Sequence, residues 1–379
     1  MALLAPLLLL VRLCTSFSSS PIAMAAKPGA GATLIATSPI RAGQVLVDEP
    51  PLISLAHSRD NEAAGGNSGT WFAPSDSYVL NLIETQLERL SDDDYKAYYQ
   101  LFGYCGGVDR ASNALDIFKT NAYPLERHSK VDYQQIISRG SSNRTSSLAA
   151  AGGVEGQPRR RSRAGVYKTI SRINHSCQPN VCYSFDGSSG RGRVIATRDI
   201  AQGAELLNAY TSLFASASER QQYLATNFGF ACDCYACSPS PGPGGDVYRV
   251  QTPADIARRL QSDERRRELG RLKEQVEQAV GLLQSGGAAA MSAIDAANHR
   301  RMQLLSEEGI ATPDLLLEVL QSQLGAAVLV GGGEGGEGLL RLCSQAYALG
   351  VLCRGVHAPE SLALRRLCNE LRFCDDLSV

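Results

Sequence analysis

Two periodicities divide the first part of the chain. Residues 31–49 alternate β-prone apolar residues with turn residues, the pattern of two short strands joined by a turn that contains Pro39 and Gly43. From residue 75 to residue 104, apolar side chains recur every three or four positions with acidic side chains between them. This spacing predicts helices, inserted after an opening hairpin.

Two stretches interrupt the periodic segments. Residues 141–163 are rich in Ser, Gly, Ala and Arg without an apolar period, so we expect a disordered loop. The basic run at 159–163 fits a solvated loop, a nuclear signal or a nucleic-acid contact. Residues 238–245 repeat Pro, Gly and Ser, which predicts a domain boundary with a linker over 238–247.

Helical periodicity dominates the rest of the chain. Thr252, Pro253 and Asp255 give a capped helix start, with proline in the first turn and an acid near the positive end of the helix dipole. Breaks follow at 286–287, before Pro313, at 331–338 and before Pro359. We therefore expect residues 248–379 to form an all-helical domain.

Composition limits the class of protein. Of the 379 residues 44% are hydrophobic and 20% are charged, which is enough for one or two cores in a soluble globular protein. A net charge of -1 provides no global attraction toward nucleic acid or an acidic membrane. We therefore expect no direct binding to nucleic acid or to a membrane. We also expect the protein to be a monomer.

Residues 1–29 resemble a leader or targeting segment. The apolar run at 3–11 is too short to span a bilayer, and a Ser-rich stretch follows it. An organelle transit peptide, a dispensable leader, a start at Met24 and a secretion signal all remain open. The cysteine pattern indicates a reducing compartment. We therefore expect the protein in the cytoplasm, the nucleus or an organelle, in preference to secretion.

Three of the eleven cysteines, Cys232, Cys234 and Cys237, stand close together. This run suits metal thiolates better than a disulfide framework, although buried packing residues or a disulfide are alternatives. Structural zinc takes four ligands in a tetrahedron, so a fourth must come from elsewhere in the chain. The other cysteines fall mostly on apolar stretches, as packing residues or a helical metal site would: Cys182, Cys343, Cys353, Cys368 and Cys374.

Three motifs occur in a fixed order: Asn-His-Ser-Cys-Gln-Pro-Asn at 174–180, Gly-Ala-Glu-Leu-Leu-Asn-Ala-Tyr at 203–210, and the cysteine triplet. Together they resemble the core of a SET-domain protein-lysine methyltransferase. The SET and MYND family is the nearest match, except that the cysteines of its MYND zinc finger are missing. The implied fold is α+β: a SET domain over 30–237 with small β-sheets, a knot-like crossing, a helical insertion at about 58–135, a disordered loop at about 138–164 and a post-SET zinc site.

The resemblance also implies two ligands. Cys177 would close the zinc site formed with the cysteine triplet, and the cofactor would be S-adenosyl-L-methionine. The backbone of Asn174 and His175 would bind the adenine edge of the cofactor, and the Asn174 side chain would fix its methionine end.

Further cofactor contacts follow from the same family. Asn121 matches an asparagine that reaches the same ligand, and Phe230 would pack either on the adenine ring or simply beside the zinc. The family's first turn reads Gly-x-Gly and lays its backbone against the cofactor. Here Ala32 and Thr33 follow Gly31, so Thr33 replaces the second glycine.

Tyr210, which ends the second motif, is the candidate catalytic residue. A lysine amine with a pKa near ~10.4 must lose its proton before it can accept a methyl group. A phenol at the end of an apolar channel can hydrogen-bond that amine and help to align it. His175 receives no acid–base role.

The predicted function is methyl transfer from S-adenosyl-L-methionine to a lysine side-chain amine in a protein substrate, histone or non-histone. The alternative is an inactive SET scaffold that acts as a protein-interaction adaptor through its helical domain. Thr33 is the one sequence hint for that alternative. A zinc hydrolase is excluded, because four cysteine ligands leave no open position for water.

Overall fold

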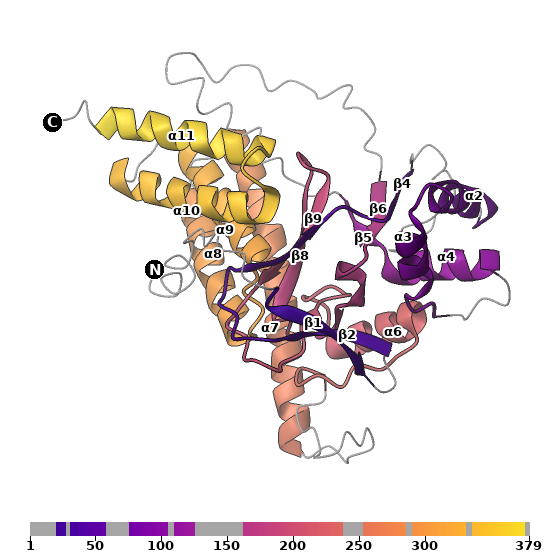
Figure 1. The fold of residues 1–379 in the computed structure, drawn as a ribbon. Coiled ribbons are helices and arrows are strands. Elements are labelled where there is room, and N and C mark those ends of the chain that lie inside the picture. Colours follow the sequence, from indigo (N-terminus) through magenta and orange to yellow (C-terminus); the bar gives the residue numbers. More distant parts are fainter. Residues whose placement is uncertain are drawn as a thin grey trace.

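The computed structural model describes residues 20–27, 31–57, 76–104, 110–125, 162–237, 253–285, 290–330 and 336–375. Small β-sheets with inserted helices come first and a group of longer helices follows (Figure 1). This is the α+β class that the sequence predicts.

The strands are β1 Ile22–Lys27, β2 Gly31–Ala36, β3 Val45–Glu49, β4 Ile53–His57, β5 Tyr123–Pro124, β6 Ser162–Val166, β7 Asn174–His175, β8 Val181–Asp186, β9 Arg191–Ala196 and β10 Leu207–Asn208. The helices are α2 Asp76–Leu87, α3 Asp92–Tyr99, α4 Arg110–Asn121, η2 Ile170–Arg172, α6 Ala217–Phe228, α7 Pro253–Gln284, α8 Ala290–Glu307, α9 Pro313–Val330, α10 Gly336–Arg354 and α11 Pro359–Asp375.

The described strands form sheets of two or three members, in the orders β1-β2, β10-β7, β3-β9-β8 and β4-β6-β5. Both strands predicted in 31–49 are present, as β2 and β3, but the predicted hairpin between them is wrong. β2 pairs with β1, and β3 pairs with β9, which is far away in sequence. Alternation in a sequence fixes which face of a strand is apolar, but it does not identify the neighbouring strand.

Strands β8 and β9 separate two cores. Val181 and Val194 lie in the core shared with β2 and η2, whereas Cys182 and Ile195 lie in the core of the C-terminal helices. Side chains that alternate along each strand therefore reach both sides of the sheet. The helical part, α7 to α11, packs directly on this sheet and is not an independent unit.

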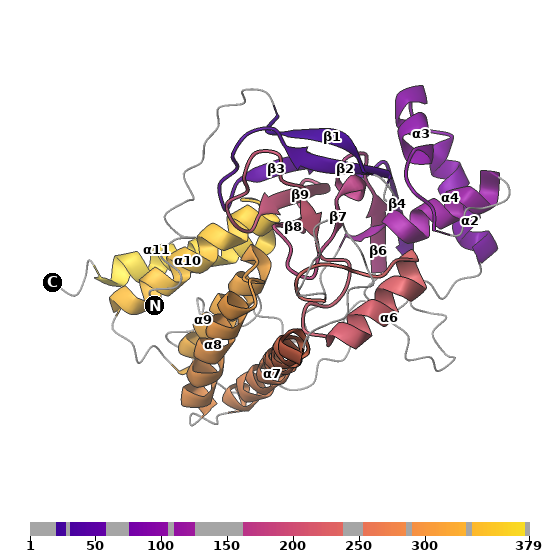
Figure 2. The same cartoon turned by 90° about the horizontal axis from the view of Figure 1, so that it is seen from below.

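The helical insertion is present as α2, α3 and α4, which lie at the edge of the molecule beyond β4 and β6 (Figure 2). These helices share a core with β4 and β6, built around Ile83, Tyr98 and Phe118. Ser91 caps α3, where its side chain accepts a hydrogen bond from the amide of Asp94.

Three of the C-terminal helices begin at the prolines that the sequence marks, since α7, α9 and α11 start at Pro253, Pro313 and Pro359. By length and composition α9 is the one described helix that passes as a membrane span. However, 67% of that window is buried inside the fold, as in the core helix of a globular protein.

Two predicted boundaries need correction. Residues 22–27 were expected in a leader ending at 29, but they form β1 and pair along the whole length of β2. Residues 162–164 were expected in a disordered loop ending at 164, but they belong to β6, which β4 and β5 flank on either side. The remainder of that loop and the 238–247 linker lie outside the described residues.

Candidate functional site

Two of the predicted motifs meet in a parallel pair of very short strands. In β7 and β10, Asn174 is opposite Leu207 and His175 is opposite Asn208. Backbone bonds extend the pairing, since the Ser176 amide donates to the Asn208 carbonyl at 2.9 Å. The segments at 174–180 and 203–210 therefore lie side by side, although they are separated in the sequence.

Tyr210 follows β10 directly and is held at both ends. Its backbone amide donates to Nδ1 of His175 at 3.0 Å, and its hydroxyl donates to the carbonyl of Ile173 at 2.5 Å. The phenol thus lies beside the residue that precedes Asn174. Burial raises the pKa of Tyr210 well above its ordinary value, with Tyr123 and Glu205 adding to the effect, so the phenol stays protonated at neutral pH.

His175 is fixed as a neutral imidazole. Its Nδ1 accepts the Tyr210 amide, which assigns the ring proton to Nε2, and Nε2 lies 3.3 Å from Sγ of Cys177. Burial lowers the pKa of His175 to about 4. With one nitrogen occupied and the other directed at sulfur, the ring connects the Tyr210 backbone to the cysteine site and is not placed as a general base.

Glu205 organises the side chains around Asn174. Its Oε1 accepts from Thr33 Oγ1 at 2.6 Å and from Asn174 Nδ2 at 2.9 Å, and its Oε2 accepts from Lys27 Nζ at 2.7 Å. Burial opposes the charge, but these three donors hold the pKa of Glu205 below its ordinary value.

Thr33 is accommodated within this network. Its side chain is buried and bonded to Glu205, so the departure from the family's glycine is absorbed in the β1–β2 side of the site. The backbone of Ala32 and Thr33 faces β1, opposite Ala26 and Ala25. Their predicted contact with the cofactor stays a prediction.

The two remaining predicted cofactor contacts, Asn121 and Phe230, lie in different surroundings. The side-chain Nδ2 of Asn121 donates to the backbone carbonyls of Phe102 and Ile117 at the end of α4. The backbone carbonyl of Asn121 accepts a hydrogen bond from the hydroxyl of Ser171, shortly before β7. Its side-chain nitrogen is therefore committed to the fold. The ring of Phe230 lies 6.0 Å from that of His175, beside the cysteine cluster, and both of its predicted roles stay predictions.

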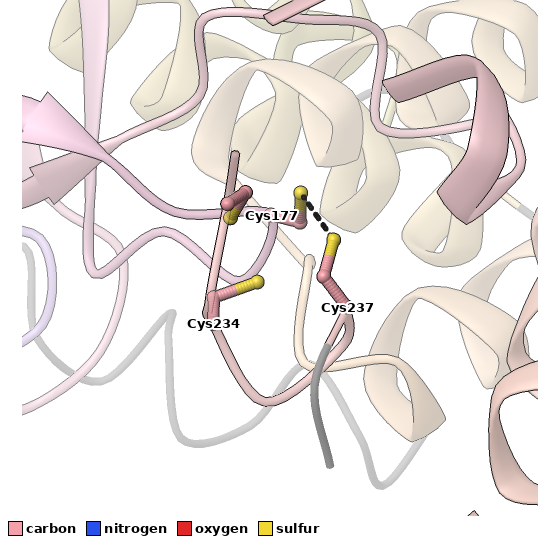
Figure 3. A group of neighbouring side chains, drawn as sticks. Cys177, Cys234 and Cys237 are labelled. Carbon is pink, nitrogen blue, oxygen red and sulfur yellow. Dashed lines mark hydrogen bonds between the residues drawn. The ribbon is translucent and has the colours of Figure 1, made fainter. Parts of the chain in front are cut away.

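The four predicted zinc ligands come together. The Sγ atoms of Cys177, Cys232, Cys234 and Cys237 all lie within 4.8 Å of one another, and Figure 3 shows sulfurs directed toward a common centre. The Cys177 and Cys237 sulfurs are 3.5 Å apart. Sulfurs at ~2.3 Å from a tetrahedral zinc are about 3.8 Å apart, so the spacing fits this metal.

A buried arginine supports the same assignment. Arg220 of α6 is fully buried, and it donates from Nε to Cys177 Sγ at 3.1 Å and from Nη2 to Cys237 Sγ at 3.7 Å. No carboxylate of the described residues lies within ion-pair distance of this guanidinium. A buried cation requires a negative partner, and four thiolates around Zn²⁺ carry a net charge of −2.

Helix α6 also holds the cysteine triplet in place. Ser216 and Glu219 form a capping box at its first turn. Gln221, one turn further along, bonds Cys232 twice, donating to its carbonyl at 2.6 Å and accepting from its amide at 2.8 Å.

The helical part reaches the site through α7. Arg266, fully buried, donates to the carbonyl of Cys177 at 3.1 Å and to that of Leu213 at 2.9 Å, while Glu308 accepts from its Nε at 2.8 Å. The segment that carries Asn174 and His175 is thereby clamped from two sides, by Arg220 on sulfur and by Arg266 on backbone.

A cavity of about 290 Å³ opens at Ala209 and Thr211, the chain neighbours of Tyr210, between the strands and the start of α9. Asn208 and Ala209 line it from the strand end, and Tyr123 and Tyr183 line it with rings 4.6 Å apart. Asp314 lines it from α9. The cavity therefore has an aromatic wall and an acidic residue, and it adjoins the chain neighbours of Tyr210, whose own side chain is not part of the lining.

Sequence reasoning missed several of these residues. Glu205 was visible inside the second motif, where a carboxylate between apolar residues is a signal for a buried role. Arg220 and Arg266 gave no signal, because an arginine on an amphipathic helix ordinarily faces solvent. Tyr123 and Tyr183 became recognisable only once the fold placed them at the cavity.

Comparisons with known proteins agree with the motifs. The SET domain family model matches residues 31–211. A 76-residue segment is 41% identical to histone-lysine N-methyltransferase set5 of Schizosaccharomyces pombe, covering 20% of this chain and 24% of that protein. Segments of similar length are 40% identical to human histone-lysine N-methyltransferase SMYD3 and 39% identical to mouse protein-lysine N-methyltransferase SMYD4, covering 19% of this chain in each case and 17% and 9% of those proteins.

The match therefore spans a quarter or less of these relatives. Among solved structures, the SET domain of LSMT bound to lysine and AdoHcy aligns with 95% of this chain and 88% of that one. Its identity is 11% and its TM-score 0.28, a likeness too distant to locate any residue.

Proposed function

Residues 31–211 are a SET domain, similar in sequence to SMYD and SET5 lysine methyltransferases, and from this we propose that the chain methylates a lysine side chain of a protein, with S-adenosyl-L-methionine as methyl donor. The observation that carries the proposal is the convergence of Tyr210 with Asn174 and His175 through the β7–β10 pair. S-adenosyl-L-methionine, when bound, supplies the electrophilic methyl group.

Tyr210 aligns the substrate amine. Its phenol stays protonated, its backbone is fixed by the bond to His175 and its hydroxyl by the bond to Ile173, so it acts as a positioned hydrogen-bonding group and not as a base. The lysine must arrive neutral, and burial beside apolar and aromatic walls lowers the pKa of an amine. The rings of Tyr123 and Tyr183 provide such surroundings along one wall of the cavity, which Asp314 lines as well.

Asn174 presents a defined amide. Its Nδ2 donates to Glu205, which leaves Oδ1 as the acceptor for a cationic donor such as the ammonium group at the methionine end of the cofactor. Glu205 and Thr33 thus position this side chain without being catalytic. The four cysteines would hold structural zinc, which would keep Cys177, two residues after His175, in place.

Thr33 no longer favours the adaptor alternative. Its side chain bonds Glu205 within the network around Asn174, so it need not block a cofactor. Calorimetry with S-adenosyl-L-methionine on zinc-loaded protein separates the two functions: an enzyme binds the cofactor, and absence of binding to a folded, zinc-loaded chain would favour the adaptor.

Tyr210→Phe is the direct test of the enzyme. We expect methyl transfer to proteome lysines, measured with labelled cofactor, to fall by about 100-fold or more, because a positioned acid–base or hydrogen-bonding group contributes about 10²–10⁴-fold. Cofactor affinity should stay within a few-fold of the starting value. Tyr235→Phe, at a largely exposed tyrosine close in sequence to the zinc ligands, is the matched control and should leave transfer unchanged. Full activity in Tyr210→Phe would contradict the assignment.

A further inference from the structure

Two thiols in the helical part stand apart from the four-cysteine site. Cys343 of α10 and Cys368 of α11 face each other with their Sγ atoms 2.8 Å apart, and Figure 1 shows the two helices side by side. Both side chains are buried, at 0% and 5% exposure, inside the core of the C-terminal helices. The sequence predicts packing residues or a helical metal site here.

The distance distinguishes these possibilities. Two thiolates on one tetrahedral zinc are about 3.8 Å apart, and the 3.5 Å between Cys177 and Cys237 approaches that value. The 2.8 Å between Cys343 and Cys368 is too short for a shared zinc and longer than a disulfide bond by about 0.8 Å. In the described part of the chain, moreover, the four-cysteine site is the only group of three or more potential ligand side chains that converge.

We propose that Cys343 and Cys368 are a modification site that forms a reversible disulfide between α10 and α11. The oxidant is a disulfide of low molecular mass, such as oxidised glutathione. The thiolate of Cys368, the slightly more exposed partner, attacks one glutathione sulfur and releases the first glutathione thiolate. Cys343 then gives up its proton and attacks Cys368 Sγ, which releases the second. Two thiols become one disulfide, and one glutathione disulfide becomes two glutathione thiols.

The bond would fix the last described helix. It would close a loop between two residues that are 25 positions apart. The closed loop would lower the conformational entropy of the unfolded chain and so stabilise the folded state. Because α10 packs against β8, where the Cys353 carbonyl accepts from Ser184, the linked pair would also brace the sheet that lines the cavity. We expect oxidation to raise the Tm by about 5 °C.

The test uses the full, zinc-loaded chain. The protein is equilibrated in glutathione buffers of increasing oxidised fraction, free thiols are alkylated after denaturation, and linked peptides are identified by mass spectrometry. We expect the peptides with Cys343 and Cys368 to appear linked, with the mass of two hydrogens lost, and to separate again with dithiothreitol. The Tm should rise with the linked fraction.

Two variants sharpen the result. Cys368→Ser should abolish the link and the Tm rise, whereas Cys353→Ser, at another buried cysteine of α10, should keep both. If Cys368→Ser does not fold, the alkylation pattern of the unaltered chain decides alone. The proposal is overturned if both thiols alkylate at every glutathione ratio, or if they form only mixed disulfides with glutathione.

Discussion

Two of the fully buried arginines, one in each part of the molecule, are neutralised in different ways. Arg301 of α8, 2% exposed, donates to Glu318 at 2.7 Å and to Asn298 at 3.1 Å, and its Nε has no hydrogen-bond partner among the described residues. Arg220 of α6, 0% exposed, uses all three nitrogens and directs two of them at sulfur.

The difference shows where each part obtains its negative charge. In the helical part a carboxylate of α9 supplies it, so helix packing alone completes the pair. In the sheet part, which includes α6, the partners are thiols, which become negative when a metal displaces their protons. Zinc is therefore expected to stabilise the sheet part and the segment at 174–180, while the helical part folds with its own counter-charges.

Removal of zinc should have the largest effect. A chelator or Cys177→Ser should leave Arg220 without its counter-charge and free the segment next to His175, so we expect methyl transfer to disappear and the Tm to fall by about 10 °C. Hydrogen exchange should increase at 174–180 and in α6, with α8 and α9 little changed. Cys353→Ala, outside the cluster, should keep about one zinc per chain. Equal loss of protection in both parts would contradict the comparison.

Arg220→Met and Arg301→Met exchange the two cations for apolar chains of similar length. Arg220→Met should weaken zinc about 10- to 100-fold in a chelator competition, the usual consequence of losing an outer-shell partner. Arg301→Met should leave zinc affinity unchanged and lower stability by about 1–3 kcal/mol, because Lys273 still pairs with Glu318. A zinc affinity that Arg220→Met does not change would show that the sulfurs need no cation.

The same contrast explains what the sequence could predict. Asn174, Tyr210 and Cys177 could be proposed from the sequence because they stand in motifs that resemble the SET core. Helix starts at prolines were identifiable as well, since a proline acts through its own backbone. Partners contributed by distant segments, such as β9 for β3, could not be found, because the pairing of distant strands leaves no trace in local periodicity.

Residues that act through others were missed for a related reason. Glu205 and Arg220 are defined by what they contact, and those contacts join residues 172 and 43 positions apart. The leader boundary at 29 failed because composition suggested a targeting segment, while pairing with β2 makes residues 22–27 a strand.

Lower pH should have a smaller effect on stability, through one glutamate in each part of the molecule. The pKa values of Glu205 and Glu308 are both held below the ordinary 4.5, by Lys27, Thr33 and Asn174 for the first and by Ser262, Arg265 and Arg266 for the second, in spite of burial. A lowered carboxyl pKa gives stability that is fully present well above pH 4.5 and is lost as the pH falls through the folded pKa.

Glu205→Gln and Glu308→Gln should therefore lower the Tm at pH 7, and their difference from the unaltered chain should shrink as the pH falls below 4.5. Only Glu205→Gln should also weaken cofactor binding, by a few-fold, because Asn174 donates to Glu205. A constant Tm difference from pH 7 to pH 3 would contradict the linkage, and a cofactor effect in Glu308→Gln would contradict the division of roles.

The smallest effect is expected at the surface. Lys168 and Asp94 form an ion pair of 2.8 Å that joins α3 to the segment before η2, and their side chains are 50% and 36% exposed. Water and salt screen such a pair, so Lys168→Ala should change the free energy of unfolding by less than about 0.5 kcal/mol, with zinc affinity and methyl transfer unaffected. The comparison with Arg220→Met at the same salt concentration isolates burial as the cause, because both substitutions remove one cation. A loss at Lys168 as large as at Arg220 would mean that the number of charges, and not their enclosure, decides the stability of the sheet part.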